Sequence, residues 1–289
     1  MIRLDAATVL LQWATGGLLF LWVTTRRREV GIGYGWLMRS VYGVVAVGAF
    51  VAGRLVNPDA GRDACSLLVV FATGAALVVS IRRRKAGVAG ERVRRARRSA
   101  RVQAMAGGES GPADDDSTPV DIDQAEFPPA LDLIAPVIGV VGLVAAGIFA
   151  GGPHVLAVAR TLAGAAFLGA VSDAMLLGHW YLVQPGLGRA PLNELNRWLA
   201  IIWPVEVLAL LWPIGMLSAL SGEVDDGWNG TLGWFWVACA VTTIALTFVT
   251  RAALKERSYT AVMAATGLLY LAILTAFGTD LVARAVLAG

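Results

Sequence analysis

The sequence predicts an all-α fold, a polytopic integral membrane helix bundle of about eight transmembrane helices. Hydrophobic residues make up 57% of its 289 residues and the mean hydropathy is +0.65, far above the range of soluble domains. Apolar runs of about 20 residues recur along the chain, and each is long enough to cross the hydrocarbon core as a helix. Strands of a membrane barrel would instead alternate over about ten residues. A helical bundle is therefore the fold to expect.

The expected spans are separated by short polar or glycine-proline segments. They cover residues 6–25, 33–54, 64–82, 130–151, 154–183, 191–220, 230–251 and 259–283. The first apolar run is interpreted as a helix rather than a cleaved signal peptide, because its arginines follow it at 26–28 instead of preceding it. The chain then divides into helices one to three (1–82), a charged tether (83–128) and helices four to eight (129–289).

The distribution of lysine and arginine between the loops predicts the orientation. Basic residues follow the first, third, fifth and seventh spans, whereas the opposite loops carry Asn57-Pro58-Asp59, Gly151-Gly152-Pro153 and an acidic stretch from Glu223 to Asp226. Cytoplasmic loops retain positive charge, so both termini are expected outside the cytoplasm. Richness in alanine, arginine and glycine is typical of a GC-rich bacterial genome, which predicts a bacterial cell membrane.

The tether between the third and fourth spans has a basic first half and an acidic second half. Few large apolar residues accompany the charges, so the segment is expected to be largely disordered. We expect its basic half to bind anionic lipid headgroups rather than nucleic acid, because it lies beside a membrane span. The expected lipid-binding residues are Arg92, Arg94, Arg95, Arg97 and Arg98.

The two halves of the chain share a weak similarity. Displacement by 157 positions pairs Thr15 with Ser172 and Trp22 with His179, and the second helix of each half then pairs Arg39 with Arg197. Four helices return a chain to its starting side, so a duplicated unit would give two parallel four-helix repeats. Chance similarity among apolar helices is the competing explanation.

Ionisable residues within the spans are expected to mark function, because each costs about 2.5–3.5 kcal/mol to insert. Residue counting places His179, Asn196, Arg197 and Arg39 in the cytoplasmic half. These four residues predict a cofactor pocket for haem b or a quinone, in which His179 ligates iron or exchanges a proton and the arginines bind an anionic group. An aromatic belt with a packing histidine is the simpler interpretation. His154 is about 37 Å away along the same helix, which excludes a bis-histidine haem within one subunit.

Two carboxylates support a different hypothesis. Asp173 and Glu206 lie deeper, near the middle of the fifth and sixth spans, where they would form a proton or substrate pathway. The sequence therefore leaves three functions in competition: a redox membrane subunit, a proton-coupled transporter or lipid-substrate carrier, and a non-catalytic scaffold subunit of a membrane complex. No metal-binding or soluble-enzyme motif is present, so whether the protein is an enzyme stays open.

Overall fold

The computed structural model describes residues 5–27, 29–84, 100, 127–150, 153–184, 187–224, 228–256 and 258–288, and within them it is all-α. Most of the predicted tether, including its five lipid-binding arginines, lies outside the described residues. The helices are α1 (Ala6–Thr25), α2 (Ile32–Val56), α3 (Ala60–Arg82), η2 (Pro129–Leu133), α5 (Ile134–Phe149), α6 (His154–Val183), α7 (Ala190–Leu211), α8 (Met216–Ser221), α9 (Thr231–Ala253) and α10 (Tyr259–Leu287).

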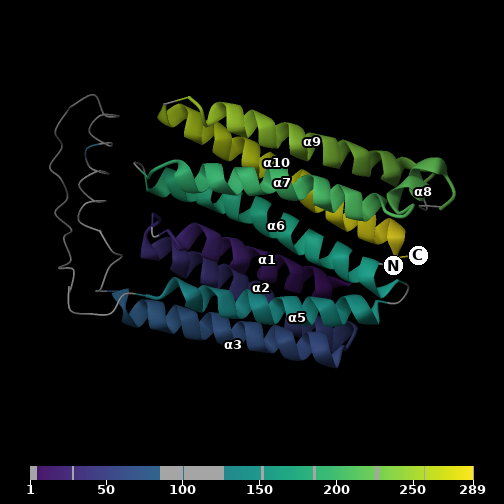
Figure 1. Ribbon diagram of the computed structural model, residues 1–289, viewed down its shortest axis with the longest axis horizontal. Coiled ribbons are helices and arrows are strands. Elements are labelled where there is room, and N and C mark those ends of the chain that lie inside the picture. Colours follow the sequence, from purple (N-terminus) through teal and green to yellow (C-terminus); the bar gives the residue numbers. More distant parts are fainter. Residues whose placement is uncertain are drawn as a thin grey trace.

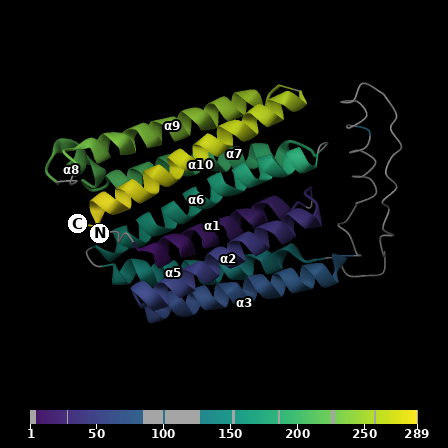
Figure 2. The ribbon, with the colours of Figure 1, turned by 180° about the vertical axis from the view of Figure 1, so that it is seen from behind.

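The long helices run side by side, and α1 begins at the same end of the bundle at which α10 finishes (Figures 1 and 2). We call this the terminal end. The opposite end, at which α3 finishes and η2 begins, is called the tether end. Several helix starts have side-chain caps: Asp5 accepts from the Thr8 amide, Asp59 from Gly61 and Arg62, and Ser258 from Ala261.

Seven segments are long and apolar enough to cross a membrane: α1, α2, α3, η2 with α5, α6, α9 and α10. The protein is therefore a multi-pass membrane protein. Helix α7 is not among the seven, because Glu194, Arg197 and Glu206 interrupt its apolar character. It nevertheless runs along the bundle beside α6 (Figure 1).

Two of the expected spans have a different local structure. The prediction of one helix over 191–220 is wrong, since α7 ends at Leu211 and the short α8 begins at Met216. Pro213 has no amide hydrogen to continue the helix, and Gly215 has φ of 41°, which glycine tolerates. The span expected at 130–151 begins as the 3-10 helix η2 and becomes α-helical at Ile134. Elsewhere the observed boundaries lie within about four residues of the expected ones.

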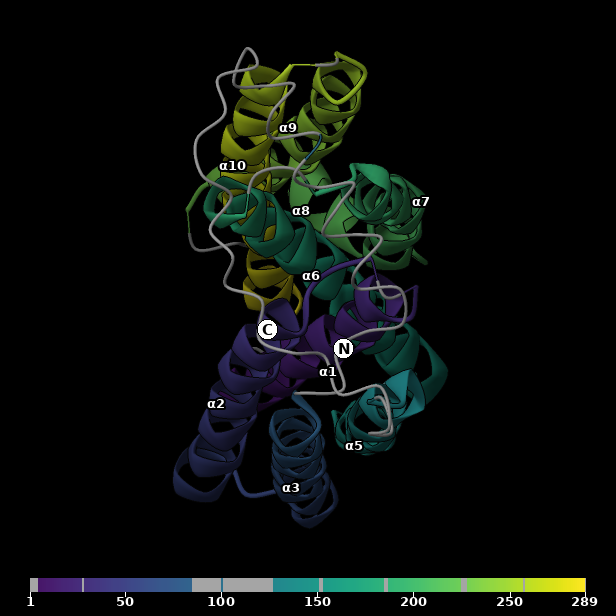
Figure 3. The same ribbon diagram turned by 90° about the vertical axis from the view of Figure 1, so that its left-hand side faces the viewer.

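The helices form two groups (Figure 3). In the first, α1 packs against α2 and α5, and α3 closes the group by packing against α2 and α5. In the second, α6 packs against α7 and α10, and α9 closes the group by packing against α7 and α10. Helices α1 and α6 hold the two groups together, since α1 packs extensively against α6.

The α1–α6 contact is a backbone contact. A Cβ on Gly16 would lie 1.8 Å from the Ala165 carbonyl oxygen, and one on Gly169 would lie 2.4 Å from the Gly16 carbonyl oxygen. Small residues let membrane helices approach in this way. Trp13 Nε1 also donates to Ser172 Oγ over 2.8 Å. This seam places the inward faces of both groups within reach of each other.

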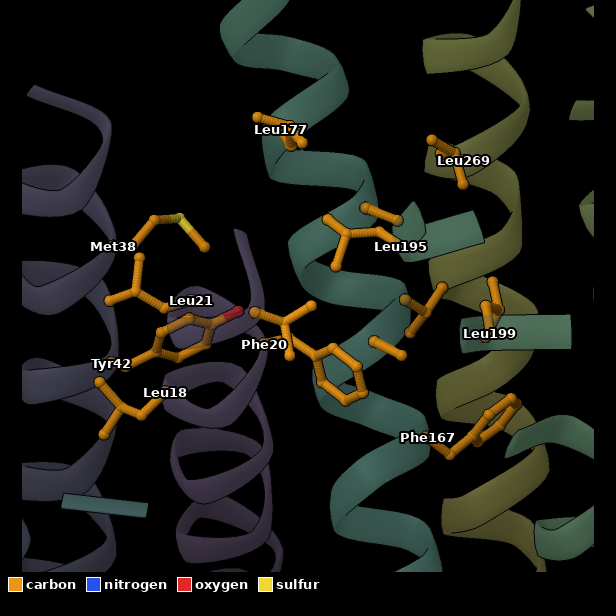
Figure 4. Close-up of a cluster of buried hydrophobic side chains, with 14 of the residues drawn as sticks. Leu18, Phe20, Leu21, Met38, Tyr42, Phe167, Leu177, Leu195, Leu199 and Leu269 are labelled. Carbon is orange, nitrogen blue, oxygen red and sulfur yellow. The ribbon is translucent and has the colours of Figure 1, made fainter. Parts of the chain in front are cut away.

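One apolar core extends through both groups. Figure 4 shows Leu18, Leu21 and Met38 from the first group and Phe167 and Leu269 from the second, all of them buried. The outward faces are also apolar, with Phe71, Val141 and Phe248 exposed. Such faces are stable against lipid, which agrees with contact to the bilayer.

Candidate functional site

The most unusual buried polar group involves the last helix. Asp280 and Arg284 are four residues apart and therefore on one face of α10. Both are fully buried, and Arg284 Nε donates to Asp280 Oδ2 over 2.8 Å. Asp280 Oδ1 has no hydrogen-bond partner among the described residues. Asp280 therefore keeps acceptor capacity that the described residues do not use.

A glutamine from the other group of helices reaches this ion pair. A Cβ on Gly164 would lie 2.3 Å from Gln12 Nε2 and 2.6 Å from Asp280 Oδ1. Gln12 of α1 and Asp280 of α10 thus occupy the space that a side chain on α6 would otherwise fill. Neither polar atom of the Gln12 amide has a hydrogen-bond partner in the described part of the chain.

Glu206 of α7 completes the arrangement. It is fully buried and interacts electrostatically with Asp280, Arg284 and Arg160. Neither of its carboxylate oxygens has a hydrogen-bond partner within the described ranges. Arg160 of α6 is fixed beside the end of α7, because its Nε donates to the Ala209 carbonyl (2.9 Å) and its guanidinium donates to that of Trp212 (2.6 Å).

These residues, Gln12, Arg160, Glu206, Asp280 and Arg284, are called the acid–arginine cluster. The cluster contains two carboxylates and two guanidinium groups within an apolar bundle, and Arg284 and Asp280 form an ion pair within it. If all four groups are ionised, the cluster is neutral overall, which limits the cost of burying it. The unused carboxylate oxygens can accept protons, water or a ligand donor. Chemically, the cluster can take up and release protons inside the membrane.

A cavity of about 460 Å³ lies at the terminal end beside this cluster. Asp5 and Arg62 from the first group line it, as do Phe149 of α5, Thr161 of α6 and Arg284 of α10. Arg62 is occupied by the protein: it donates to Asp5 and Thr8, to Asp63 (2.9 Å) and to the Asn57 carbonyl oxygen (2.5 Å). Arg284 lies at the edge of this cavity but is itself fully buried.

Asp173 forms a second buried acidic site. It is fully buried on α6 and accepts a hydrogen bond from the Tyr42 hydroxyl of α2, which links the two groups of helices. Figure 4 shows the Tyr42 ring between the helices with its hydroxyl directed away from α2. Asp173 Oδ2 has no hydrogen-bond partner among the residues described. Both predicted pathway carboxylates are therefore buried, Asp173 on α6 beside Tyr42 of α2 and Glu206 on α7.

The four residues predicted for a haem or quinone pocket lie in different surroundings. Arg39 forms a two-pronged ion pair with Asp132 of η2, over 2.8 and 2.7 Å. Asn196 is buried and its Nδ2 donates to the Thr247 carbonyl over 3.1 Å, whereas Arg197 is exposed. His179 is exposed too, with Nδ1 3.1 Å from the Tyr270 hydroxyl. Among the described contacts, no hydrogen bond or ion pair joins any two of these four residues.

The sequence reasoning missed the residues that complete the cluster. The expected last span, 259–283, includes Asp280 and stops one residue before Arg284, and neither residue was singled out; α10 continues to Leu287 and buries both. The available signal was an acid and an arginine four positions apart in an apolar helix. Gln12 and Asp132 were missed because the neighbours of a single polar residue in an apolar run do not indicate which distant residue it contacts.

Comparisons of this chain with protein-family models, with curated proteins and with solved structures found no significant match. The site must therefore be interpreted from its own geometry.

Proposed function

We propose that this protein is a proton-coupled membrane transporter that uses Glu206 and Asp280 as its proton-binding groups. The observation that carries the proposal is the unused acceptor capacity of these two buried carboxylates, beside Arg284 and Arg160. Ionisable residues are rare within the membrane and are typical of proton relays and transport pathways. In the Arg39–Asp132 ion pair both carboxylate oxygens accept hydrogen bonds, whereas among the described residues Glu206 accepts none and Asp280 accepts on one oxygen only.

The proposed topology has eight membrane crossings, with α7 as the eighth. Helix α7 is 22 residues long, or about 33 Å, and packs against α6 and α9 inside the bundle. Because α1 begins and α10 ends at the terminal end, the chain must traverse the bundle an even number of times (Figure 2). The buried Asn196 and Glu206 then face other helices. The other polar and charged residues of α7, Asn193, Glu194 and Arg197, lie in its first two turns near the headgroups.

The orientation we propose places the tether end in the cytoplasm and both termini outside it. Exposed basic residues at the tether end support this, namely Arg27, Arg82, Arg84, Arg251 and Lys255. At the terminal end Arg62, Arg160 and Arg284 are buried and held by protein groups. Exposed Trp212, Trp228 and Trp234 near that end suit a membrane interface.

We also propose that the two groups of helices are parallel repeats. Each group has its first helix packed against its second and fourth, and its third packed against its second and fourth. Helices α1 and α6 are the first helices of their groups, and they meet at the central seam. Transporters built from repeats move one half against the other around a site near their interface. The cluster draws Gln12 from one half and its charged residues from the other.

The residues predicted for a redox pocket do not form a cluster of this kind among the described contacts. The ring of His179 is exposed, and Arg39 is bound by Asp132. A scaffold role would leave the unused carboxylate oxygens of Glu206 and Asp280 without a purpose. The transporter hypothesis is therefore the one that the buried groups support best.

Liposomes that contain the purified protein and a trapped pH indicator test the proposal. Small organic acids, amines, amino acids and sugars are added outside under an imposed pH gradient. We expect one class to drive proton movement, and we expect Glu206→Gln or Asp280→Asn to lower its rate at least tenfold. Glu223→Gln is the matched control, because Glu223 is exposed at the terminal end. Proton movement with no class of solute, or unchanged movement in both cluster variants, would overturn the proposal.

A further inference from the structure

The two groups of helices contact each other differently at the two ends of the bundle. At the tether end, Glu194 near the start of α7 accepts from Arg26 at the end of α1 over 2.5 Å, and Arg27 lies 3.4 Å from the same carboxylate oxygen. Helix α1 belongs to the first group and α7 to the second. These ion pairs therefore join the groups at the tether end.

Deeper contacts extend this closure along the seam between the groups. The rings of Tyr34 of α2 and Trp180 of α6 meet edge to face, with their centroids 5.9 Å apart. Two turns further along α2, the Tyr42 hydroxyl donates to Asp173 of α6. Polar and aromatic contacts between the groups thus occupy the tether half of the seam at successive levels.

The terminal end has a cavity where the tether end has contacts. Both groups line the cavity, with Thr8 of α1 and Ala146 of α5 from the first group and Thr161 of α6 from the second. Its volume of about 460 Å³ is enough for a small solute. Space between the groups is therefore open to the terminal side of the bundle.

The ion pairs described at the terminal end lie within one group of helices. Arg62 pairs with Asp5 inside the first group, and Arg284 pairs with Asp280 on the same helix of the second. Midway along the bundle, the close backbone contact of α1 with α6 holds the groups together. The groups are thus joined in the middle and at the tether end, and a cavity separates them at the terminal end.

The Glu194 contact can break and reform without stranding a charge in the apolar core. The side chains of Arg26 and Arg27 are 29% and 55% exposed and that of Glu194 is 15% exposed. Ion pairs exposed to this degree are weak, because water or headgroups solvate the separated charges. The Arg39–Asp132 pair differs, since its side chains are only 3% and 2% exposed and would be left buried and unpaired.

We propose that this structure is the state of the transporter that is open at the terminal end, and that Glu194 with Arg26 and Arg27 forms a gate that must open before the tether end becomes accessible. This inference rests on the proposed function and names the element that controls access to its site. When the gate breaks, the groups part at the tether end and pivot about the α1–α6 contact, which closes the terminal cavity.

Cysteine reactivity at the two ends tests the gate. Replacement of Cys65 and Cys239 by alanine first gives a background without thiols. Met38→Cys reports on the tether end, because Met38 is fully buried one turn along α2 from Tyr34 and on the same face. Ala146→Cys reports on the terminal end, because Ala146 lines the cavity. The reaction rate of each cysteine with a small charged thiosulfonate is measured in lipid nanodiscs, where both ends are accessible.

The gate variant is Glu194→Gln, which removes the charge and keeps the size of the side chain. We expect it to raise the reaction rate of Met38→Cys about tenfold and to lower that of Ala146→Cys, because a shift between two states changes the two ends in opposite directions. Glu256→Gln is the matched control, since Glu256 is exposed at the tether end. The charge exchange Arg26→Glu with Glu194→Arg should return both rates toward those of the intact gate.

Two outcomes overturn the inference. Unchanged rates at both reporter positions would show that the Glu194 contact does not control access. A rise at both positions would show that the variant loosens the whole bundle, which contradicts alternating access. Should Glu194→Gln fail to fold, Arg26→Gln breaks the same pair from the α1 side and is expected to give the same two changes.

Failure of the gate and failure of the transporter function are seen in different measurements. The cysteine rates need no solute and no pH gradient, so they report on the gate alone. Solute-driven proton movement in liposomes, together with unchanged cysteine rates, would disprove the gate and leave the transporter function standing. Absence of proton movement with every class of solute would disprove the transporter function itself.

Discussion

Two buried groups in this molecule both combine arginine with carboxylates but differ in how far the carboxylate oxygens are hydrogen-bonded. In the first group of helices, both carboxylate oxygens of Asp132 accept from Arg39, and Thr25 adds a third donor. In the second, Glu206 receives no hydrogen bond from the described residues and Asp280 receives donors on one oxygen only. The difference teaches that burial of charge does not by itself mark a functional site. The transporter proposal depends instead on the acceptor capacity that Glu206 and Asp280 leave unused among the described residues.

The largest expected effect comes from breaking the saturated pair. Arg39→Met leaves the Asp132 carboxylate buried without its main donor, which should cost about 3–5 kcal/mol of stability. Thermal unfolding in detergent, followed by tryptophan fluorescence, measures the loss. Glu206→Gln is the matched comparison and should unfold close to the unmodified protein, since no hydrogen bond is broken. Equal destabilisation by the two variants would remove the distinction between the groups.

The seam that joins the two groups gives the next largest effect. Gly16→Ala forces a methyl group into the backbone of α6, so the helices must separate at a cost of about 1–3 kcal/mol. The same separation should draw Gln12 away from Asp280 and reduce proton-coupled transport. Gly74→Ala is the control, because nothing lies within 4 Å of a Cβ at that position. Similar unfolding temperatures for the two variants would show that the seam is not tightly packed.

Tyr42 offers an intermediate test, because Asp173 has one bonded and one unused oxygen. Tyr42→Phe removes the hydroxyl and keeps the ring, so it should cost about 1 kcal/mol in stability. Tyr270→Phe is the matched comparison at an exposed position, where the hydroxyl contacts His179 Nδ1 rather than a buried carboxylate. A cost as large as that of Arg39→Met would place Asp173 with the saturated structural groups instead.

The smallest effect is expected at His179. Its ring is exposed, so His179→Ala should change stability by less than about 0.5 kcal/mol. Optical spectra of the oxidised and dithionite-reduced protein, with organic extraction for quinone, should be the same for the variant and the unmodified protein. A reduced haem band or bound quinone that disappears in His179→Ala would revive the redox hypothesis and count against the transporter.

The helical membrane fold could be predicted because its causes are local. Apolar length, the arginines after α1 and the glycine-proline breaks act within a few residues of the positions they determine. The break between α7 and α8 was underestimated. One continuous span was expected over 191–220, but the combination of Pro213 with Gly215 ends the helix at Leu211.

The burial of Asp173 and Glu206 followed from their positions within apolar runs. The partners of these carboxylates could not be predicted in the same way, because Tyr42 is 131 positions from Asp173 along the chain. Arg39 was assigned to a cofactor pocket because its true partner could not be recognised: Asp132 is 93 positions away and lies just beyond the tether. An arginine inside a membrane has a large energetic need for a carboxylate, but the sequence does not say which one meets it.

The sequence by itself determined that the chain is a helical membrane protein, where its helices run, and that acids and arginines occur within the apolar spans. Hydropathy and helix length depend only on neighbouring residues, so no partner is needed to predict them. Only the tertiary structure decided which charges are saturated and which are not. That distinction depends on contacts between helices far apart in the chain, such as Gln12 and Asp280 meeting over Gly164, and such contacts arise only when the bundle packs.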